Sequence, residues 1–104
     1  MKKQHIETRP KTIFCDIDGT LIFHENPSLT STPNYKPKIL PGVVEKLKEW
    51  DMKGYNLILT TGRKESCREE TKRQLSLLGI FYDQLIMGIG GGVRVLINDK
   101  KPYG

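Results

Sequence analysis

Short apolar runs of β character alternate with amphipathic helical segments in this chain, and no other feature constrains its fold as strongly. The β-type runs cover residues 12–15, 56–61, 84–87 and 93–97. Helical spacing of apolar residues predicts helices over 43–50 and 65–78, ended by Gly54 and Gly79. Alternating strands and helices predict an α/β fold with a parallel sheet and right-handed crossovers. Because the strand runs are continuously apolar, we expect a three-layer, doubly wound sheet covered on both faces.

The length of 104 residues predicts a single domain. Residues 1–11 are polar and are interpreted as a lead-in, and residues 12–104 as the domain itself. No apolar run approaches the ~20 residues of a membrane span, and the N-terminus lacks the apolar core of a signal peptide. We therefore expect a cytoplasmic protein without a membrane partner, in which Cys15 and Cys67 are free thiols.

The formal net charge of +5 attracts anions but does not by itself identify them. Basic residues are scattered and interleaved with glutamates, whereas a nucleic-acid-binding protein more often carries a basic stripe with exposed aromatic residues. We therefore favour solvated helix faces and a small phosphorylated substrate over nucleic acid as the partner.

Polar side chains follow three of the expected strands. They are Asp16 and Asp18, then Thr60 and Thr61, then Asn98 and Asp99. The carboxyl ends of parallel strands meet at one edge of a sheet, where ligands of such sheets bind, so these residues predict one site. Several carboxylates make an oxygen-rich site for Mg²⁺, which screens the repulsion between an anionic nucleophile and a phosphate.

Glycines beside these polar residues predict close backbone approach to a phosphate. The Gly19-Thr20 turn is expected to direct backbone N–H groups at phosphate oxygens. Thr61 offers a hydroxyl, and Gly62 beside it allows close approach at the start of a helix.

Three segments resemble motifs of the haloacid-dehalogenase-like (HAD) superfamily. Residues 14–21 read FCDIDGTL and resemble its first motif, a hydrophobic strand followed by DxDGTL. Residues 57–63, LILTTGR, are similar to its second motif, and residues 95–99, VLIND, to its fourth. The three matches occur in the order of the family and together span residues 12–100.

The resemblance implies a Mg²⁺-dependent phosphatase. Asp16 would attack phosphorus and form an aspartyl-phosphate, and Asp18 would act as general acid and then as general base. Mg²⁺ would be held by the Asp16 carboxylate, the Asp18 backbone carbonyl and Asp99. Thr61 would bind phosphate, with adjacent Thr60 as the alternative.

The chain departs from the family pattern at its C-terminal end. No position stands out as the basic residue of the third motif, for which Arg94 and then Lys100 are the candidates. Asn98 stands where many members have an acid, and the chain ends five residues after Asp99. It is therefore either a minimal version of the fold or a fragment of a longer protein.

Residues 22–41 and 62–84 are too short to hold a cap domain, so we expect a capless member of the superfamily. Capless members act on large substrates or use a neighbouring subunit as a lid, which leaves a homo-oligomer open. By analogy the first substrate candidate is a sugar phosphate of bacterial surface-polysaccharide synthesis, followed by nucleotides or nucleic-acid ends. A non-catalytic phosphate- or nucleotide-binding relative and a receiver-type signalling domain are the competing classes. DxDGT on a single strand argues against the receiver domain.

Overall fold

The computed structural model describes residues 8–30 and 32–99 of the chain. Three strands are present: β1 (Thr12–Asp16), β2 (Asn56–Thr60) and β3 (Gln84–Ile86). The helices are α1 (Pro27–Thr30), α2 (Val43–Met52) and α3 (Arg68–Leu77), with the 3₁₀ turn η1 (Glu65–Cys67) in front of α3. The expected helices are thus confirmed, except that the first turn of the second one is 3₁₀.

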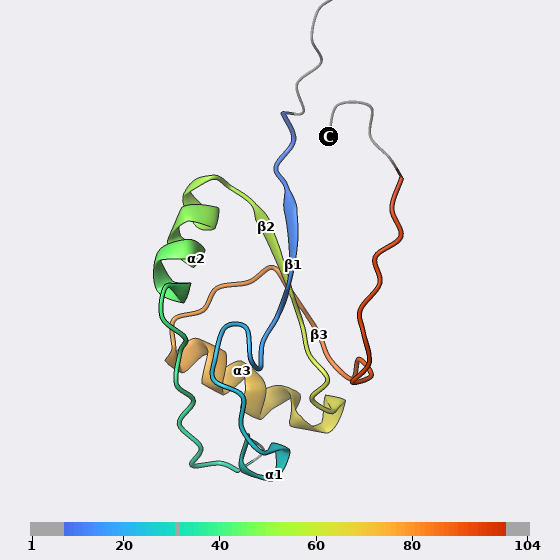
Figure 1. Ribbon diagram of the computed structural model, residues 1–104. Coiled ribbons are helices and arrows are strands. Elements are labelled where there is room, and N and C mark those ends of the chain that lie inside the picture. The colour runs from blue at the N-terminus through green and yellow to red at the C-terminus, as the bar shows by residue number, and fades with distance from the viewer. Residues whose placement is uncertain (1–7, 31, 100–104) are drawn as a thin grey trace, which may run out of the picture.

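The strands form one parallel sheet in the order β1-β2-β3 (Figure 1). Asp16, Thr60 and Ile86 are neighbours in the register, so all three strands end at the same edge. Each crossover leads to the next strand in the same direction across the sheet, from β1 to β2 and from β2 to β3. Right-handed connections therefore place α2 and α3 on the same face of the sheet. The predicted α/β class and the parallel sheet are confirmed, and residues 8–30 and 32–99 contain no inserted cap domain.

Glycine ends both long helices, as the sequence predicts. Gly54 follows α2 with φ +70°, and Gly79 follows α3 with φ +72°. Because glycine has no Cβ, it adopts this left-handed conformation without the steric cost that another residue would carry.

The two faces of the sheet differ in burial. Leu57 and Leu59 of β2 belong to the core with Leu75 of α3. On the opposite face Phe14 is 51% and Ile86 41% exposed. Side chains alternate across a strand, so the continuous apolar runs supply a buried face and a half-exposed one. The helices described here cover the first of these faces.

The prediction of a fourth strand over residues 93–97 is wrong, because no strand forms there. Val93 is 94% and Ile97 92% exposed. A parallel strand needs a crossover of about a dozen residues or more, and only residues 87–92 separate β3 from Val93. The chain instead turns back after β3 and runs away from the strand ends as an extended segment (Figure 1).

Two further expectations can be compared with the structure only in part. Residues 1–7 of the predicted lead-in lie outside the described residues, so its extent stays a prediction. Within residues 8–30 and 32–99, the structure contains no helix of the length and apolarity that a membrane crossing requires.

Candidate active site

At the carboxyl end of β1, two adjacent residues, one in the core and one a candidate nucleophile, differ in exposure. Cys15 is 7% exposed and belongs to the core, whereas the Asp16 side chain is 40% exposed. Burial, followed by the negative charge of Asp16, raises the pKa of the Cys15 thiol. The thiol therefore stays protonated and inward, so Asp16 is the reactive group that this strand presents.

The turn after β1 corrects one expectation. The Gly19 N–H donates to the carbonyl of Ile22 at 2.8 Å, and the Thr20 N–H donates to that of Ile17 at 3.2 Å. These N–H groups therefore close the turn and are not free to bind a phosphate. Gly19 adopts a left-handed conformation in this turn, with φ +82°. The turn instead places Ile17 in the core, fully buried, between the two aspartates.

The end of β2 supplies a hydroxyl at a point of tight backbone packing. Thr61 is 1% exposed, and its Oγ1 accepts a hydrogen bond from the Arg63 N–H at 3.1 Å. A hydroxyl that accepts one bond still has its proton to donate. A Cβ on Gly62 would lie 3.0 Å from the carbonyl oxygen of Ile89, a tighter contact than most Cβ atoms make, so this position favours glycine.

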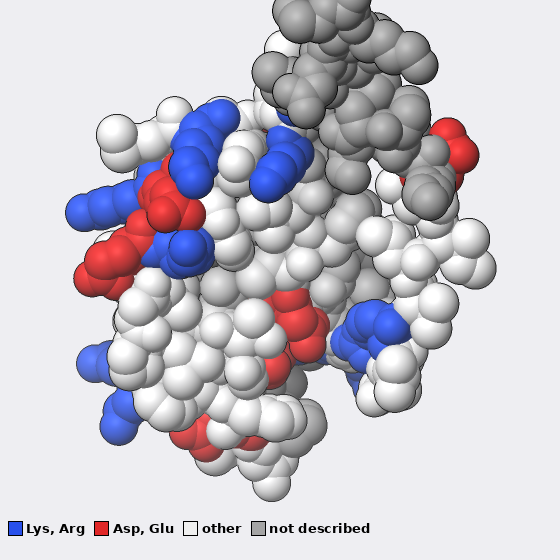
Figure 2. Space-filling model, turned by 45° about the horizontal axis from the view of Figure 1, so that its top comes forward, with Lys and Arg blue, Asp and Glu red and all other residues white. Residues whose placement is uncertain are grey.

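These residues line one pocket of about 690 Å³. It is formed by Asp16, Asp18, His24, Glu25, Ser28, Thr61, Gly62, Arg63, Lys64, Cys67, Gly91 and Arg94. Figure 2 shows acidic side chains in a hollow with basic side chains across it, while charges of both signs intermingle elsewhere on this face. The predicted residues Asp16, Asp18, Thr61, Gly62 and Arg94 are thus brought together, whereas Thr60 does not line the pocket.

Arg94 reaches the pocket from the glycine-rich loop. Its Nη1 donates to the carbonyls of Gly90 and Gly92, at 2.8 and 2.7 Å. Its Nη2 lies 3.8 Å from Oδ1 of Asp16, and its side chain is 39% exposed. At this exposure the ion pair contributes little to stability. Lys100, the other basic candidate, lies outside the described residues.

Asp99 is the predicted metal ligand that the structure does not place at the pocket. It is exposed at the far end of residues 93–99, and it is not among the pocket residues. Within residues 8–30 and 32–99, no group of three His, Cys, Asp or Glu side chains could hold a metal. The reason is the missing fourth strand, which the prediction needed to carry Asp99 to the edge that holds Asp16.

Arg63 is a pocket residue that the sequence reasoning passed over. Its Nε and Nη2 donate to the two carboxylate oxygens of Asp18, at 3.0 and 2.9 Å. The available signal was its position directly after Thr61-Gly62, at the end of the second strand. The pocket residues His24, Glu25 and Ser28 were also missed, because the segment 22–41 that carries them has no periodic pattern.

The oxygen ligands that the pocket offers fit a Mg²⁺ ion in part. Mg²⁺ is held in proteins by one or two carboxylates together with substrate phosphate and water. The half-exposed Asp16 carboxylate suits this role, and the pocket volume leaves space for phosphate and water. The Asp18 carboxylate is held by Arg63 through both of its oxygens, and the backbone carbonyl of Asp18 is the metal ligand that the HAD resemblance implies for this residue.

A family model described as the polynucleotide kinase PNKP phosphatase domain matches residues 10–88. The chain belongs to this family. Its HAD-like character, expected from the three motifs, is thereby confirmed, and the chain is a phosphatase domain of that superfamily. Curated proteins gave no match.

Two solved structures from RNA repair complexes are similar to this chain over most of its length. One, in the Pnkp1/Rnl/Hen1 RNA repair complex, is 33% identical with a TM-score of 0.66 over 89% of this chain and 30% of the other. A second structure of the Pnkp1/Rnl/Hen1 complex is 27% identical with a TM-score of 0.64, covering 91% and 36%. The chain thus spans about a third of the length of these relatives.

A D,D-heptose 1,7-bisphosphate phosphatase from B. bronchiseptica, solved with magnesium and phosphate, shares the fold. It is 18% identical with a TM-score of 0.53, over 78% of this chain and 51% of the other.

Proposed function

We propose that this chain hydrolyses phosphate monoesters with Asp16 as the nucleophile. The observation that carries this proposal is the convergence of Asp16, Asp18 and Thr61 in one pocket at the ends of two paired parallel strands. Membership of a phosphatase-domain family supports it independently.

In the proposed reaction a carboxylate oxygen of Asp16 attacks phosphorus, and the bond from phosphorus to the ester oxygen breaks. The leaving oxygen takes a proton from the carboxyl group of Asp18. Asp18 then accepts a proton from water, whose oxygen attacks the phosphorus of the aspartyl-phosphate and releases inorganic phosphate and free Asp16. Thr61 and Arg94 bind the non-bridging oxygens of the phosphate throughout.

We further propose that the Asp16 carboxylate and the Asp18 backbone carbonyl hold Mg²⁺ in the pocket. When bound, the ion offsets the repulsion between the anionic nucleophile and the anionic phosphate. The HAD resemblance implies Asp99 as a third ligand. This role stays a prediction, and Asp99 is not among the residues that line the pocket.

For the substrate we now favour a phosphorylated nucleic-acid end over a sugar phosphate. The family carries the name of a polynucleotide kinase, and the 33% identical structure belongs to an RNA repair complex. A pocket without a cap domain admits the end of a polymer, and the net charge of +5 favours a polyanion. The sugar phosphate stays an untested prediction.

The test is hydrolysis of p-nitrophenyl phosphate with and without Mg²⁺, by wild type and by Asp16→Asn. We expect Mg²⁺-dependent release of nitrophenol that Asp16→Asn reduces to background, because an amide does not replace the carboxylate nucleophile. Asp51→Asn, an exposed site on α2, is the matched control and should retain activity.

Substrate class is then tested with oligonucleotides phosphorylated at the 3′ or 5′ end, compared with hexose phosphates at equal concentration. Faster turnover of one oligonucleotide supports the favoured substrate class, and faster turnover of a hexose phosphate contradicts it. A folded wild type that turns over none of these esters would contradict the enzymatic proposal and favour the non-catalytic alternative.

A further inference from the structure

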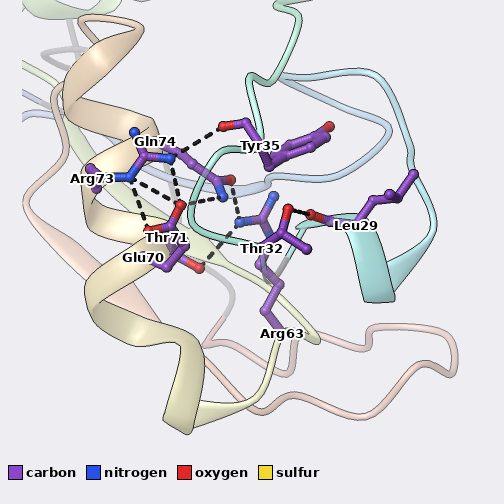
Figure 3. A network of polar contacts seen from close by, with 8 residues as sticks. All are labelled: Leu29, Thr32, Tyr35, Arg63, Glu70, Thr71, Arg73 and Gln74. Carbon is purple, nitrogen blue, oxygen red and sulfur yellow. Dashed lines mark hydrogen bonds and ion pairs between the residues drawn. The ribbon is translucent and has the colours of Figure 1, made fainter.

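A buried arginine links Asp18 to helix α3. The Arg63 side chain is 7% exposed and the Asp18 side chain 19%. Beyond its two bonds to the Asp18 carboxylate, Arg63 donates from Nη1 to Thr71 Oγ1 at 3.2 Å and to Gln74 Oε1 at 2.7 Å. The guanidinium therefore lies between a pocket residue and two residues of α3, as Figure 3 shows for the α3 side.

The donors of Arg63 are nearly all committed. A guanidinium carries five N–H groups in a fixed plane, and four of them are used by Asp18, Thr71 and Gln74. Arg94, by contrast, is 39% exposed and faces Asp16. The two arginines of the pocket thus differ in role, since Arg94 is available to a phosphate and Arg63 holds the Asp18 side chain.

The α3 side of this arrangement is itself fixed. Thr71 and Gln74 are each 1% exposed, and the Gln74 amide also donates to Glu70 at 3.4 Å. Glu70 binds Arg73, whose Nη2 donates to the backbone carbonyl of Tyr35 at 3.2 Å (Figure 3). Arg63 is thereby anchored to α3 and, through α3, to the segment 22–41, part of which lines the pocket.

We infer that Arg63 is the positioning residue for Asp18 and that Gln74 holds Arg63 in place for this task. The inference rests on the proposed function, because Asp18 needs a fixed orientation only if it transfers protons. A bidentate arginine defines the plane of a carboxylate, which a single cation does not. A carboxylate oxygen has more than one lone-pair site, so the gripped oxygens still have sites for a substrate or water.

A buried ion pair that only stabilises the fold is the alternative to be separated from this role. Both interpretations predict that loss of Arg63 disturbs the protein, since it leaves Asp18 without its partner. They differ in one respect. A residue that acts through Asp18 has no further effect once Asp18 is disabled, whereas an independent structural contribution persists.

The test is a double-mutant cycle on kcat with p-nitrophenyl phosphate, using Arg63→Met, Asp18→Asn and the double variant. We expect each single variant to lower kcat by about 100-fold, the lower end of the range for general acid–base groups. The double variant should fall within about 2-fold of Asp18→Asn. Inhibition by inorganic phosphate should change by less than about 3-fold in Arg63→Met, since Arg63 is not a phosphate ligand.

Gln74→Met provides a second variant that leaves the contact between Arg63 and Asp18 in place. It removes the Oε1 acceptor and should lower kcat by about 10-fold in the wild-type background, with little effect in Asp18→Asn. Lys72→Met, which removes an exposed lysine paired with Glu69 on α3, is the matched control and should keep full kcat. Circular dichroism establishes that each variant is folded.

Multiplicative losses in the double variant, or phosphate inhibition weakened by 10-fold or more, would overturn the inference while leaving the proposed function intact. An active wild type whose Gln74→Met variant keeps full kcat would overturn the part assigned to Gln74. A wild type without turnover would overturn the proposed function, and this inference with it.

Discussion

The candidate site has two halves that are built in different ways. Asp16 ends β1, and Asp18 and Thr61 directly follow the ends of β1 and β2, so the register of the sheet and the buried neighbours fix their positions. Arg94 lies on a segment that follows the glycine-rich loop and pairs with no strand within the described residues, and Asp99 at the end of this segment lies outside the pocket. The difference teaches that a polar residue after an apolar run reaches the site only when that run is held in the sheet.

Core substitution in the first half should give the largest effect on stability. Leu59 of β2 is fully buried beside the strand end, so Leu59→Ala should lower the free energy of unfolding by about 2–5 kcal/mol. Urea denaturation followed by circular dichroism measures this. A loss below about 1 kcal/mol would show that the sheet is packed less tightly than the structure indicates.

Arg94→Met should affect turnover more than stability. Loss of a charged hydrogen bond to the phosphate should lower kcat/KM by about 10- to 100-fold, equivalent to about 1.4–3 kcal/mol. The melting temperature should not change measurably, since the side chain is 39% exposed. Unchanged kcat/KM would exclude Arg94 as the phosphate-binding cation.

Asp99→Asn sharpens the comparison, because the resemblance and the structure disagree at this position. The structure keeps Asp99 away from the pocket, so we expect the Mg²⁺ concentration for half-maximal activity to change by less than about 2-fold. A rise of 10-fold or more would show that Asp99 reaches the site during turnover.

The smallest effect is expected at Ile97, which is 92% exposed. Ile97→Ala should change the free energy of unfolding by less than about 0.5 kcal/mol. A cost near that of Leu59→Ala, in the same urea experiment, would break the comparison by showing that this segment is buried in solution.

The residues of the first half were predictable because their signal is local. An apolar run followed by DxDGT defines a strand and its end, and parallel pairing then brings Asp16 near Thr61. The direction of residues 93–97 was not predictable in this way, because an apolar run does not state which neighbour it pairs with. The role of Arg63 escaped because it depends on Thr71 and Gln74, two polar residues whose burial shows only in three dimensions.

The place of β1 at the edge of the sheet has a practical consequence for handling this chain. An edge strand offers backbone donors and acceptors to any extended segment it meets, and Phe14 adds a half-exposed aromatic ring to this one. Concentrated samples should therefore associate by strand addition along β1. Dilute protein, or the Phe14→Lys variant, should therefore be used so that kinetic measurements report on the monomer.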